Sequence, residues 1–126
     1  MIKSDTINQS DKKNIIITKA TVRAADRLGL TGVLLSNIIG VSEANISRMR
    51  NGKYIIPENS KVSELSILLL RVFRSLDAIV DGDENTTKSW MKNVNTALGD
   101  APINKIVTVQ GLIDVLTYLD ARRATI

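Results

Sequence analysis

Apolar residues recur at helical spacing over much of this chain, most clearly between Lys61 and Val80. When this stretch is drawn at 100° per residue, its apolar residues gather on one broad face. That face contains Val62, Leu65, Leu68, Leu69, Val72, Phe73, Leu76, Ile79 and Val80. Ile67 and Leu70 fall on a different side, where they could pack on a second module, contact a partner subunit or simply be exposed. The pattern predicts a long amphipathic helix.

Capping side chains and glycines divide the rest of the chain into shorter helices. The helical patterns are preceded by Thr31, Ser42, Ser60 and Thr108 and followed by Gly29, Gly40 and Gly52. We predict helices over about 15–28, 32–39, 43–51, 61–80, 84–93 and 109–124, with short helical pieces around Leu98 and Pro102. No stretch has the alternating pattern of a strand. The sequence therefore predicts an all-α fold.

Composition narrows the possible chemistry. The 126 residues are 44% hydrophobic but only 3% aromatic, so the core must be built mainly from Leu, Ile and Val. The chain has no Cys and no His, which excludes disulfides, the usual zinc sites, and Cys-His or Ser-His catalysis. The acidic run DGDEN at 81–85 is too short for a calcium-binding loop and is expected to form a turn and a helix cap. We therefore expect no enzyme activity, no metal and no cofactor.

Two further features bear on the protein's location. No stretch approaches the ~20 apolar residues that a membrane-spanning helix needs, and the polar N-terminal segment lacks the pattern of a signal peptide. A chain without cysteine also fits a reducing compartment. We expect a cytoplasmic protein with no membrane partner.

Positive charge is concentrated in the first two thirds of the chain. Residues 1–80 hold 12 Lys and Arg against seven Asp and Glu, a net charge of +5, whereas residues 81–126 hold five against six. A basic first part suits a polyanionic partner, although +5 is also compatible with ordinary surface charge. The asymmetry indicates two different roles for the two parts.

The stretch most suggestive of function is TGVLLSNIIGVSEANISRMRNGK, at 31–53. It predicts two short helices joined by a tight turn at Gly40-Val41, and a small residue at such a turn allows two helices to cross steeply. The apolar residues that would hold the pair together are Leu34, Leu35, Ile38, Val41, Ile46 and Met49. This arrangement is typical of a DNA-binding helix-turn-helix.

In that motif the N-terminal half of the second helix enters the major groove. Asn45 carries the donor and acceptor that read adenine, and Arg48 carries the fork that reads guanine or grips phosphate. Thr31 could bind a phosphate at a helix N-terminus, and Arg50, Lys53 and Lys61 could contact the DNA backbone. The candidate DNA-binding residues are Thr31, Ser42, Glu43, Ala44, Asn45, Arg48, Asn51 and Lys53. We also expect a homodimer, because such domains bind two half-sites on successive turns of double-stranded DNA.

The alternative for residues 31–53 is a structural pair of helices with a polar outer face. The steep Gly-Val-Ser turn and the basic charge of this part favour DNA binding over that alternative.

The segment LTGVLLSNIIGVSEANISRMRNGK resembles the Xre-type helix-turn-helix of repressors and antitoxins, and the remainder resembles the toxin-binding module of the MbcA/ParS/Xre antitoxin family. The likeness spans about residues 20–126. The features that carry it after the helix-turn-helix are the run from Leu70 to Leu76, Gly82, Trp90, Asn95, Leu98, Gly99, Pro102, Thr108, Gly111, Val115, Tyr118, Leu119, Asp120 and Arg122.

This resemblance implies a specific function. Family members pair with a RES-domain toxin, an enzyme that consumes NAD, and cover its active site with their C-terminal end. They also bind their own promoter through the N-terminal helices. The resemblance thus implies an antitoxin of a type II toxin-antitoxin system whose toxin is encoded by the adjacent gene.

The predicted domain organisation follows from these features. Residues 1–13 are polar, lack periodicity and are expected to form a flexible N-terminal tail. Residues 14–59 would form the Xre-like DNA-binding region. Residues 60–126 would form the toxin-binding domain, with the long helix over 60–80 connecting the two.

The last predicted helix presents two faces. Val109, Leu112, Ile113, Leu116 and Leu119 are expected to form its core stripe. A second face, with Gly111, Val115, Tyr118 and Arg122, suits contact with a partner because Tyr and Arg are enriched in interface anchors. The candidate toxin-binding residues are Gly111, Val115, Tyr118, Arg122, Arg123, Thr125 and Ile126. The alternative is that the two arginines only stabilise the last turn through the helix dipole.

A different function remains open from the residues themselves. The chain could be a stand-alone dimeric helix-turn-helix repressor whose second module only dimerises. The off-face positions Ile67 and Leu70 favour that reading, whereas the pattern from Trp90 to Arg122 favours the antitoxin. A gene for a RES-domain protein next to this one would support the antitoxin.

Overall fold

The computed structural model describes residues 8–125, and this part of the chain folds into seven helices. They are α1 (Gln9–Leu28), α2 (Gly32–Ile39), α3 (Glu43–Arg50), α4 (Lys61–Ile79), α5 (Glu84–Lys92), α6 (Pro102–Lys105) and α7 (Val109–Arg123). Within residues 8–125 the only extended pairing is an isolated bridge between Asn95 and Asp100. The predicted all-α fold is confirmed.

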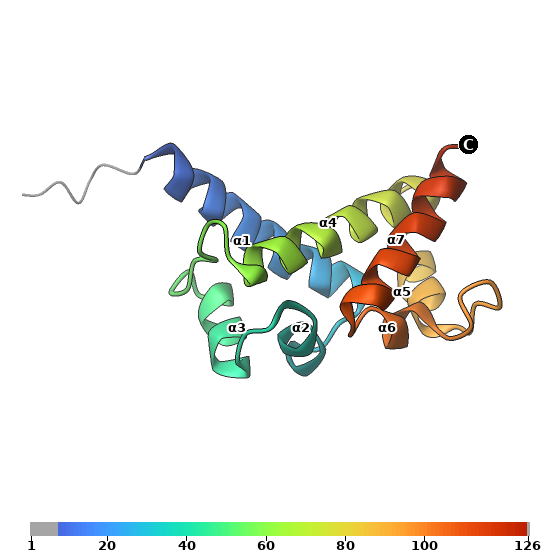
Figure 1. Cartoon of the computed structure of the whole chain (residues 1–126), viewed down its shortest axis with the longest axis horizontal. Helices are drawn as coiled ribbons and strands as arrows, with labels where there is room; N and C mark the ends of the chain where they lie inside the picture. The colour runs from blue at the N-terminus through green and yellow to red at the C-terminus, as the bar shows by residue number, and fades with distance from the viewer. Residues whose placement is uncertain (1–7, 126) are drawn as a thin grey trace, which may run out of the picture.

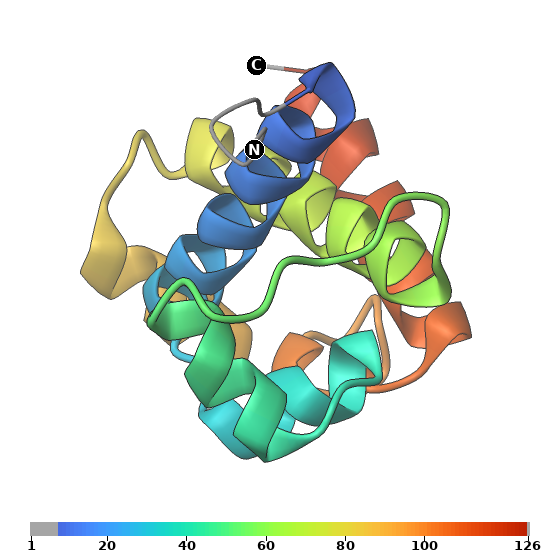
Figure 2. The same ribbon diagram turned by 90° about the vertical axis from the view of Figure 1, so that its left-hand side faces the viewer.

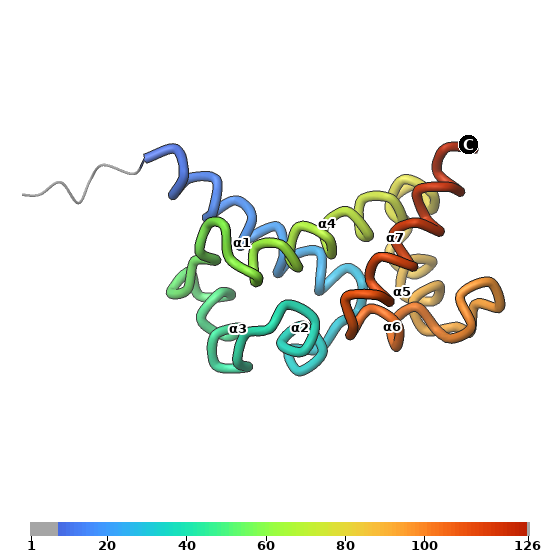
Figure 3. Tube along the Cα trace, viewed as in Figure 1, coloured from blue at the N-terminus to red at the C-terminus, as the bar shows by residue number. Residues whose placement is uncertain are grey.

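The long helix α4 occupies the middle of the molecule and packs against α1, α2 and α7 (Figure 1). The short helices α2 and α3 lie below α1 and α4 in this view, and α5, α6 and α7 gather at the other end. The segment from α3 to α4 crosses over α1 (Figure 2), where the Ile56 amide donates a hydrogen bond to the buried Thr18 hydroxyl at 2.9 Å. The loop between α5 and α6 extends away from the helices in the tube of Figure 3.

The helix ends follow the predicted capping residues. The side chains of Thr31, Ser42, Ser60 and Thr108 each accept a hydrogen bond from a backbone amide in the first turn of the helix that follows. Gly29 and Gly40 end α1 and α2 in the left-handed conformation, with φ of 79° at both. These bonds satisfy helix-end groups that would otherwise lack partners.

One predicted boundary is wrong in the described part of the chain. The helix expected from about Ile15 begins at Gln9, so residues 9–13 are helical rather than part of a tail. The Asn8 side chain accepts a hydrogen bond from the Asp11 amide at 2.8 Å, and Asp11 adds negative charge in the first turn. Both stabilise an exposed helix start without any apolar periodicity, which explains why the pattern missed it. Residues 1–7 of the predicted tail lie outside the described residues.

The buried face of α4 differs from its apolar face. Leu69, Val72 and Leu76 are buried as expected, but Ser66 and Ser75 are buried too. Because α4 packs against α1 and α7, its covered face is wider than its stripe of large apolar residues. Ile67 is 40% exposed, which leaves it outside the intramolecular core.

The core of the described chain is continuous across both predicted parts. One cluster of buried apolar residues includes Leu35 and Ile46 from the helix-turn-helix segment and Leu112 and Leu119 from α7. Leu69 of α4 belongs to the same cluster. The N-terminal and C-terminal regions are therefore joined by shared packing and not only by a connecting helix.

The inner face of α7 is rotated from its predicted position. Leu112, Leu116 and Leu119 are buried as expected, but Val109 and Ile113 are 54% and 42% exposed. Gly111 and Val115, which were placed on a contact face, are buried instead. The predicted and the observed buried faces of α7 share Leu112, Leu116 and Leu119. The periodicity alone therefore could not show which flank of these leucines meets α4.

Gly111 lies under the carbonyl of Lys105 at the end of α6, and a Cβ built on it would overlap that carbonyl. We predict that Gly111→Ala lowers the free energy of unfolding by about 1–3 kcal/mol, the usual cost of overpacking. Chemical denaturation would measure the loss. Gly32→Ala is the matched control: the added Cβ meets only Ile46 Cγ2 at 3.9 Å, so stability should be unchanged or slightly higher. Equal stability of Gly111→Ala and the unmodified chain would contradict this account of the α6–α7 packing.

Candidate functional site

Helices α2 and α3 form a pair joined by a short turn, in the segment predicted to be a helix-turn-helix. Gly40 makes the turn with φ of 79°, and the Ser36 hydroxyl closes it by donating a hydrogen bond to the Val41 carbonyl. Leu35, Ile38, Val41, Ile46 and Met49 are buried between these helices and the rest of the molecule. The predicted apolar contacts of this segment are thus largely present, and they turn the remaining face of α3 outward.

The predicted DNA-binding residues lie almost entirely on the exposed surface. Thr31, Ser42, Glu43, Ala44, Arg48, Asn51 and Lys53 are exposed, and Asn45 is half-buried. The Asn45 side-chain oxygen accepts a hydrogen bond from Arg48 Nη1 at 2.8 Å, so the two principal reading residues are joined to each other. Thr31 and Ser42 use their hydroxyls as helix caps. Each hydroxyl still has a proton to donate to an anion such as a phosphate.

Sequence reasoning passed over one residue on the outer face of α3. Ser47 is exposed and lies one turn after Ala44 and one turn before Asn51. Helical spacing from those two neighbours was the signal that could have identified it. Ser47 therefore joins the candidate reading surface.

Arg50 has a different role from the backbone contact that was expected of it. Its guanidinium donates two hydrogen bonds to the Asp26 carboxylate of α1, at 2.8 Å and 3.0 Å. The hydrogen bond from Arg50 lowers the pKa of Asp26, and the charges of Arg50 and Lys88 act in the same direction. The pair raises the pKa of Arg50 in turn. Arg50 thus fixes the end of α3 on α1.

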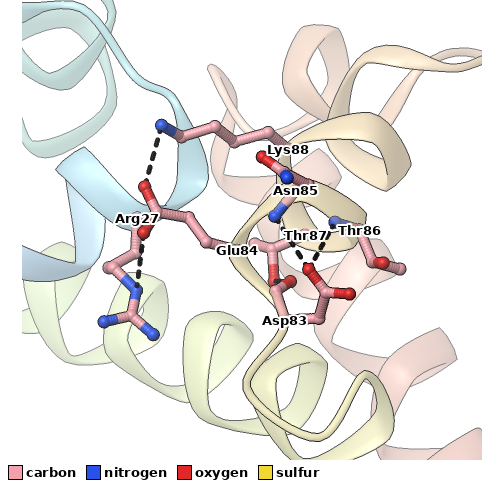
Figure 4. Close-up of polar contacts among 7 residues, drawn as sticks. All are labelled: Arg27, Asp83, Glu84, Asn85, Thr86, Thr87 and Lys88. Atoms are coloured by element: carbon pink, nitrogen blue, oxygen red, sulfur yellow. Dashed lines mark hydrogen bonds and ion pairs between the residues drawn. The ribbon is translucent and has the colours of Figure 1, made fainter.

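A second group of charges joins α1 to α5. Figure 4 shows Glu84 between Lys88, with Nζ 3.0 Å from Oε2, and Arg27, with Nε 3.9 Å from Oε1. In the same view Asp83 caps α5 by accepting hydrogen bonds from the Asn85 and Thr86 amides. The prediction that the acidic run at 81–85 forms a turn and cap is confirmed. Among the described residues, no group of three or more Asp or Glu side chains is arranged to hold a metal ion.

At the other end of the molecule, α5 and α7 present a stack of side chains. The rings of Trp90 and Tyr118 lie 6.3 Å apart with an interplanar angle of 23°. The guanidinium of Arg122 lies over the Tyr118 ring, with its carbon 5.5 Å from the ring centroid. A cation over an aromatic ring is attracted by the ring quadrupole, so the Trp90–Tyr118–Arg122 stack is a preformed surface feature.

Two hollows accompany this stack. One, of about 430 Å³, is bordered by Trp90 and by the exposed Val94 in the loop after α5. The other, of about 330 Å³, is bordered by Tyr118 and Leu98. Aromatic and arginine side chains beside open hollows are the usual anchors of protein interfaces.

The predicted toxin-binding residues divide into three groups. Tyr118 is half-buried, and Arg122, Arg123 and Thr125 are exposed at the end of α7, where a partner could reach them. Gly111 and Val115 are buried against α6 and the core, so they support the surface rather than form it. Ile126 lies outside the described residues.

The carboxy-terminal helices thus carry an aromatic and arginine surface beside two hollows. Residues 75–124, from the end of α4 through α7, match the family model described as the antitoxin Xre/MbcA/ParS C-terminal toxin-binding domain. This part of the chain therefore belongs to that family of antitoxin domains, as its sequence pattern indicated. No curated protein matches the chain. None of the helices in residues 8–125 is long and apolar enough to cross a membrane.

The Asp26–Arg50 pair gives a pH-dependent prediction. We expect Asp26→Asn to lower the free energy of unfolding at neutral pH by about 0.2–1 kcal/mol, the range for partly exposed pairs. The folded-state pKa of Asp26 lies below its usual value of 3.8, so the pair stabilises the fold above that pH. Its contribution should decline as the pH falls through the folded-state pKa.

Denaturant unfolding of both proteins at neutral and acidic pH would measure this effect. Glu64→Gln is the control, because it removes the Lys61–Glu64 pair, whose side chains are 87% and 70% exposed. That change should leave stability nearly unaltered. A penalty for Asp26→Asn that is the same at neutral pH and at about pH 2 would count against the ion pair as its cause.

Proposed function

We propose that this chain is the antitoxin of a type II toxin-antitoxin system that neutralises a RES-domain, NAD-consuming toxin and represses its own operon. The observation that carries the proposal is the match of residues 75–124 to an antitoxin toxin-binding domain. The antitoxin acts by binding, without catalysis and without a cofactor. The toxin is the product of the adjacent gene.

Neutralisation uses the C-terminal end of α7. Tyr118, Arg122, Arg123, Thr125 and Ile126 cover the active site of the toxin and exclude its substrate. Arg122 and Arg123 suit this task because a guanidinium pairs with acidic groups or occupies positions that phosphates of a dinucleotide would take. The stack of Arg122 on Tyr118 supports the proposal, since it holds one of these groups in place before the partner arrives.

Repression uses the outer face of α3 in the major groove of operator DNA. Arg48 and Asn45 read base edges, Ser42, Glu43, Ala44, Ser47 and Asn51 line the groove, and Thr31 and Lys53 contact phosphates. The exposure of this face supports the assignment. Helix α3 and the C-terminal end lie at opposite ends of the molecule in both Figure 1 and Figure 2. One chain could therefore hold DNA and toxin at the same time.

The division of labour follows the proposed regions. Residues 14–59 bind DNA, and residues 60–126 bind the toxin, with α4 belonging structurally to both. The functional form is a homodimer, because two half-sites on double-stranded DNA require two recognition helices.

The second candidate function is a stand-alone dimeric repressor whose C-terminal part only dimerises. The exposed Ile67, Val109 and Ile113 favour it, since exposed apolar side chains often mark subunit contacts. Co-expression with the adjacent gene separates the two functions. The antitoxin is supported if the protein encoded by the adjacent gene alone arrests growth and this chain both restores growth and co-purifies with it. The repressor is supported if that protein is harmless or does not associate with this chain.

We predict that Arg48→Ala weakens operator binding by about 5–150-fold, because a base-reading arginine contributes about 1–3 kcal/mol. Toxin binding should be unchanged. Lys92→Ala removes one exposed positive charge from α5, away from α3, and serves as the control. Gel-shift titration with the promoter fragment measures both variants. Equal operator affinities for Arg48→Ala and Lys92→Ala would contradict the groove assignment.

We predict that deleting residues 122–126 abolishes neutralisation and spares DNA binding. The deletion removes the cation over Tyr118 and the end of the chain but leaves the buried Leu119 in place. Growth rescue in cells that express the toxin is the primary measurement, and operator binding confirms that the truncated chain is folded. Rescue by the truncated chain would remove the C-terminal end from the mechanism.

A further inference from the structure

A cationic hollow lies between the C-terminal halves of α4 and α7, separate from the Trp90–Tyr118–Arg122 stack. It has a volume of about 310 Å³ and is lined by Arg71, Arg74, Ser75, Asp120 and Arg123. We call it the arginine hollow. Arg71 and Arg74 precede residues 75–124, and neither is among the candidate toxin-binding residues predicted from the sequence.

Hydrogen bonds link the side chains of the arginine hollow. Ser75 is only 2% exposed, and its hydroxyl donates a hydrogen bond to Asp120 Oδ1 at 2.6 Å. Arg123 Nη1 in turn donates to the Ser75 hydroxyl at 3.5 Å. These contacts tie α4 to α7 and hold the Asp120 carboxylate beside Ser75.

The positive charge of the arginine hollow exceeds the negative charge of its one carboxylate, Asp120. Three guanidinium groups face one carboxylate, which leaves two positive charges in excess. Arg71 Nη2 lies 3.8 Å from Asp120 Oδ2, an ion pair too long for a hydrogen bond, and its side chain is 57% exposed. Within residues 8–125, Arg74 has no acidic partner within 4.0 Å. Most of the N–H donors in the hollow are therefore available to an incoming anion.

The side chains of the hollow suit an oxyanion, either a carboxylate or a phosphate. Guanidinium groups bind planar carboxylates and phosphates through paired hydrogen bonds. The two positive charges in excess attract either anion. The position of the hollow decides which of the two reaches it.

The position of the hollow favours a protein over nucleic acid. Arg123 is next to Arg122 of the stack, so the hollow continues the surface at the C-terminal end of α7. Helix α3 lies at the opposite end of the molecule (Figures 1 and 2). DNA on the outer face of α3 would extend away from the arginine hollow.

We infer that the arginine hollow receives an acidic side chain of the toxin and that Arg71 and Arg74 of α4 are part of the toxin interface. This inference rests on the proposed antitoxin function and extends its binding surface from α7 onto α4. In the complex the carboxylate is held between the guanidinium groups of two helices and is shielded from water. Truncation of one partner in such a pair raises the dissociation rate.

The test is the affinity of the full chain for the toxin of the adjacent gene, with Arg74→Gln and Arg74→Lys compared by calorimetric titration. We expect Arg74→Gln to weaken binding about 10–100-fold, as for an interface arginine whose partner is left unpaired. Arg74→Lys keeps the charge but loses the paired donors, so its affinity for the toxin should lie between those of the unmodified chain and of Arg74→Gln. Arg23→Gln makes the same change on an exposed position of α1 and should bind as the unmodified chain does.

Three outcomes overturn the inference in distinguishable ways. If the unmodified chain does not bind the toxin, the proposed function fails and this inference fails with it. If the unmodified chain binds and both Arg74→Gln and Arg71→Gln match it, the function stands and the arginine hollow is not in the interface. If Arg74→Gln weakens operator binding and leaves toxin binding intact, the ligand of the hollow is a nucleic-acid phosphate. Thermal unfolding of each variant establishes that the fold is retained, and Arg71→Gln replaces Arg74→Gln if it is not.

Discussion

Burial of α4 against three other helices is the interaction on which the rest of the structure depends. Leu69, Val72 and Leu76 are almost completely buried, and α1, α2 and α7 all pack on the same helix. Buried aliphatic side chains of this size each contribute about 1.5–3 kcal/mol through removal from water. Because the helix-turn-helix segment and α7 share this support, a change in the packing of one region affects the position of the other.

In addition to this packing, ion pairs between helices orient α3 and α5 relative to α1. The Arg50–Asp26 pair directs the end of α3, and the contacts of Glu84 with Arg27 and Lys88 hold α5 beside α1. Each pair is partly exposed, so its contribution to stability is small. Their value lies in geometry: they fix the end of α3 on α1 and hold α5 beside α1.

The sequence predicted the elements of this fold better than it predicted their contacts. Capping residues and glycines act locally, so the starts of α2, α3, α4 and α7 were readable from single side chains such as Thr31 and Thr108. The family of the C-terminal part was also readable, because its residues recur in a recognisable order. The contact face of α7 was not, since Val115 is buried or exposed according to which flank meets α4. Arg50 illustrates the same limit: its partner Asp26 is 24 residues away, and no local pattern announces the pair.

The length of α4 has a consequence for how the two surfaces relate. Its 19 residues give a rod of about 28 Å, at 1.5 Å per residue. The rod runs from the side of the helix-turn-helix segment to the arginine hollow beside the end of α7. It therefore acts as a spacer of nearly three nanometres between the α2–α3 pair and the end of α7. If the chain binds DNA and a toxin as proposed, this spacing keeps the two ligands apart.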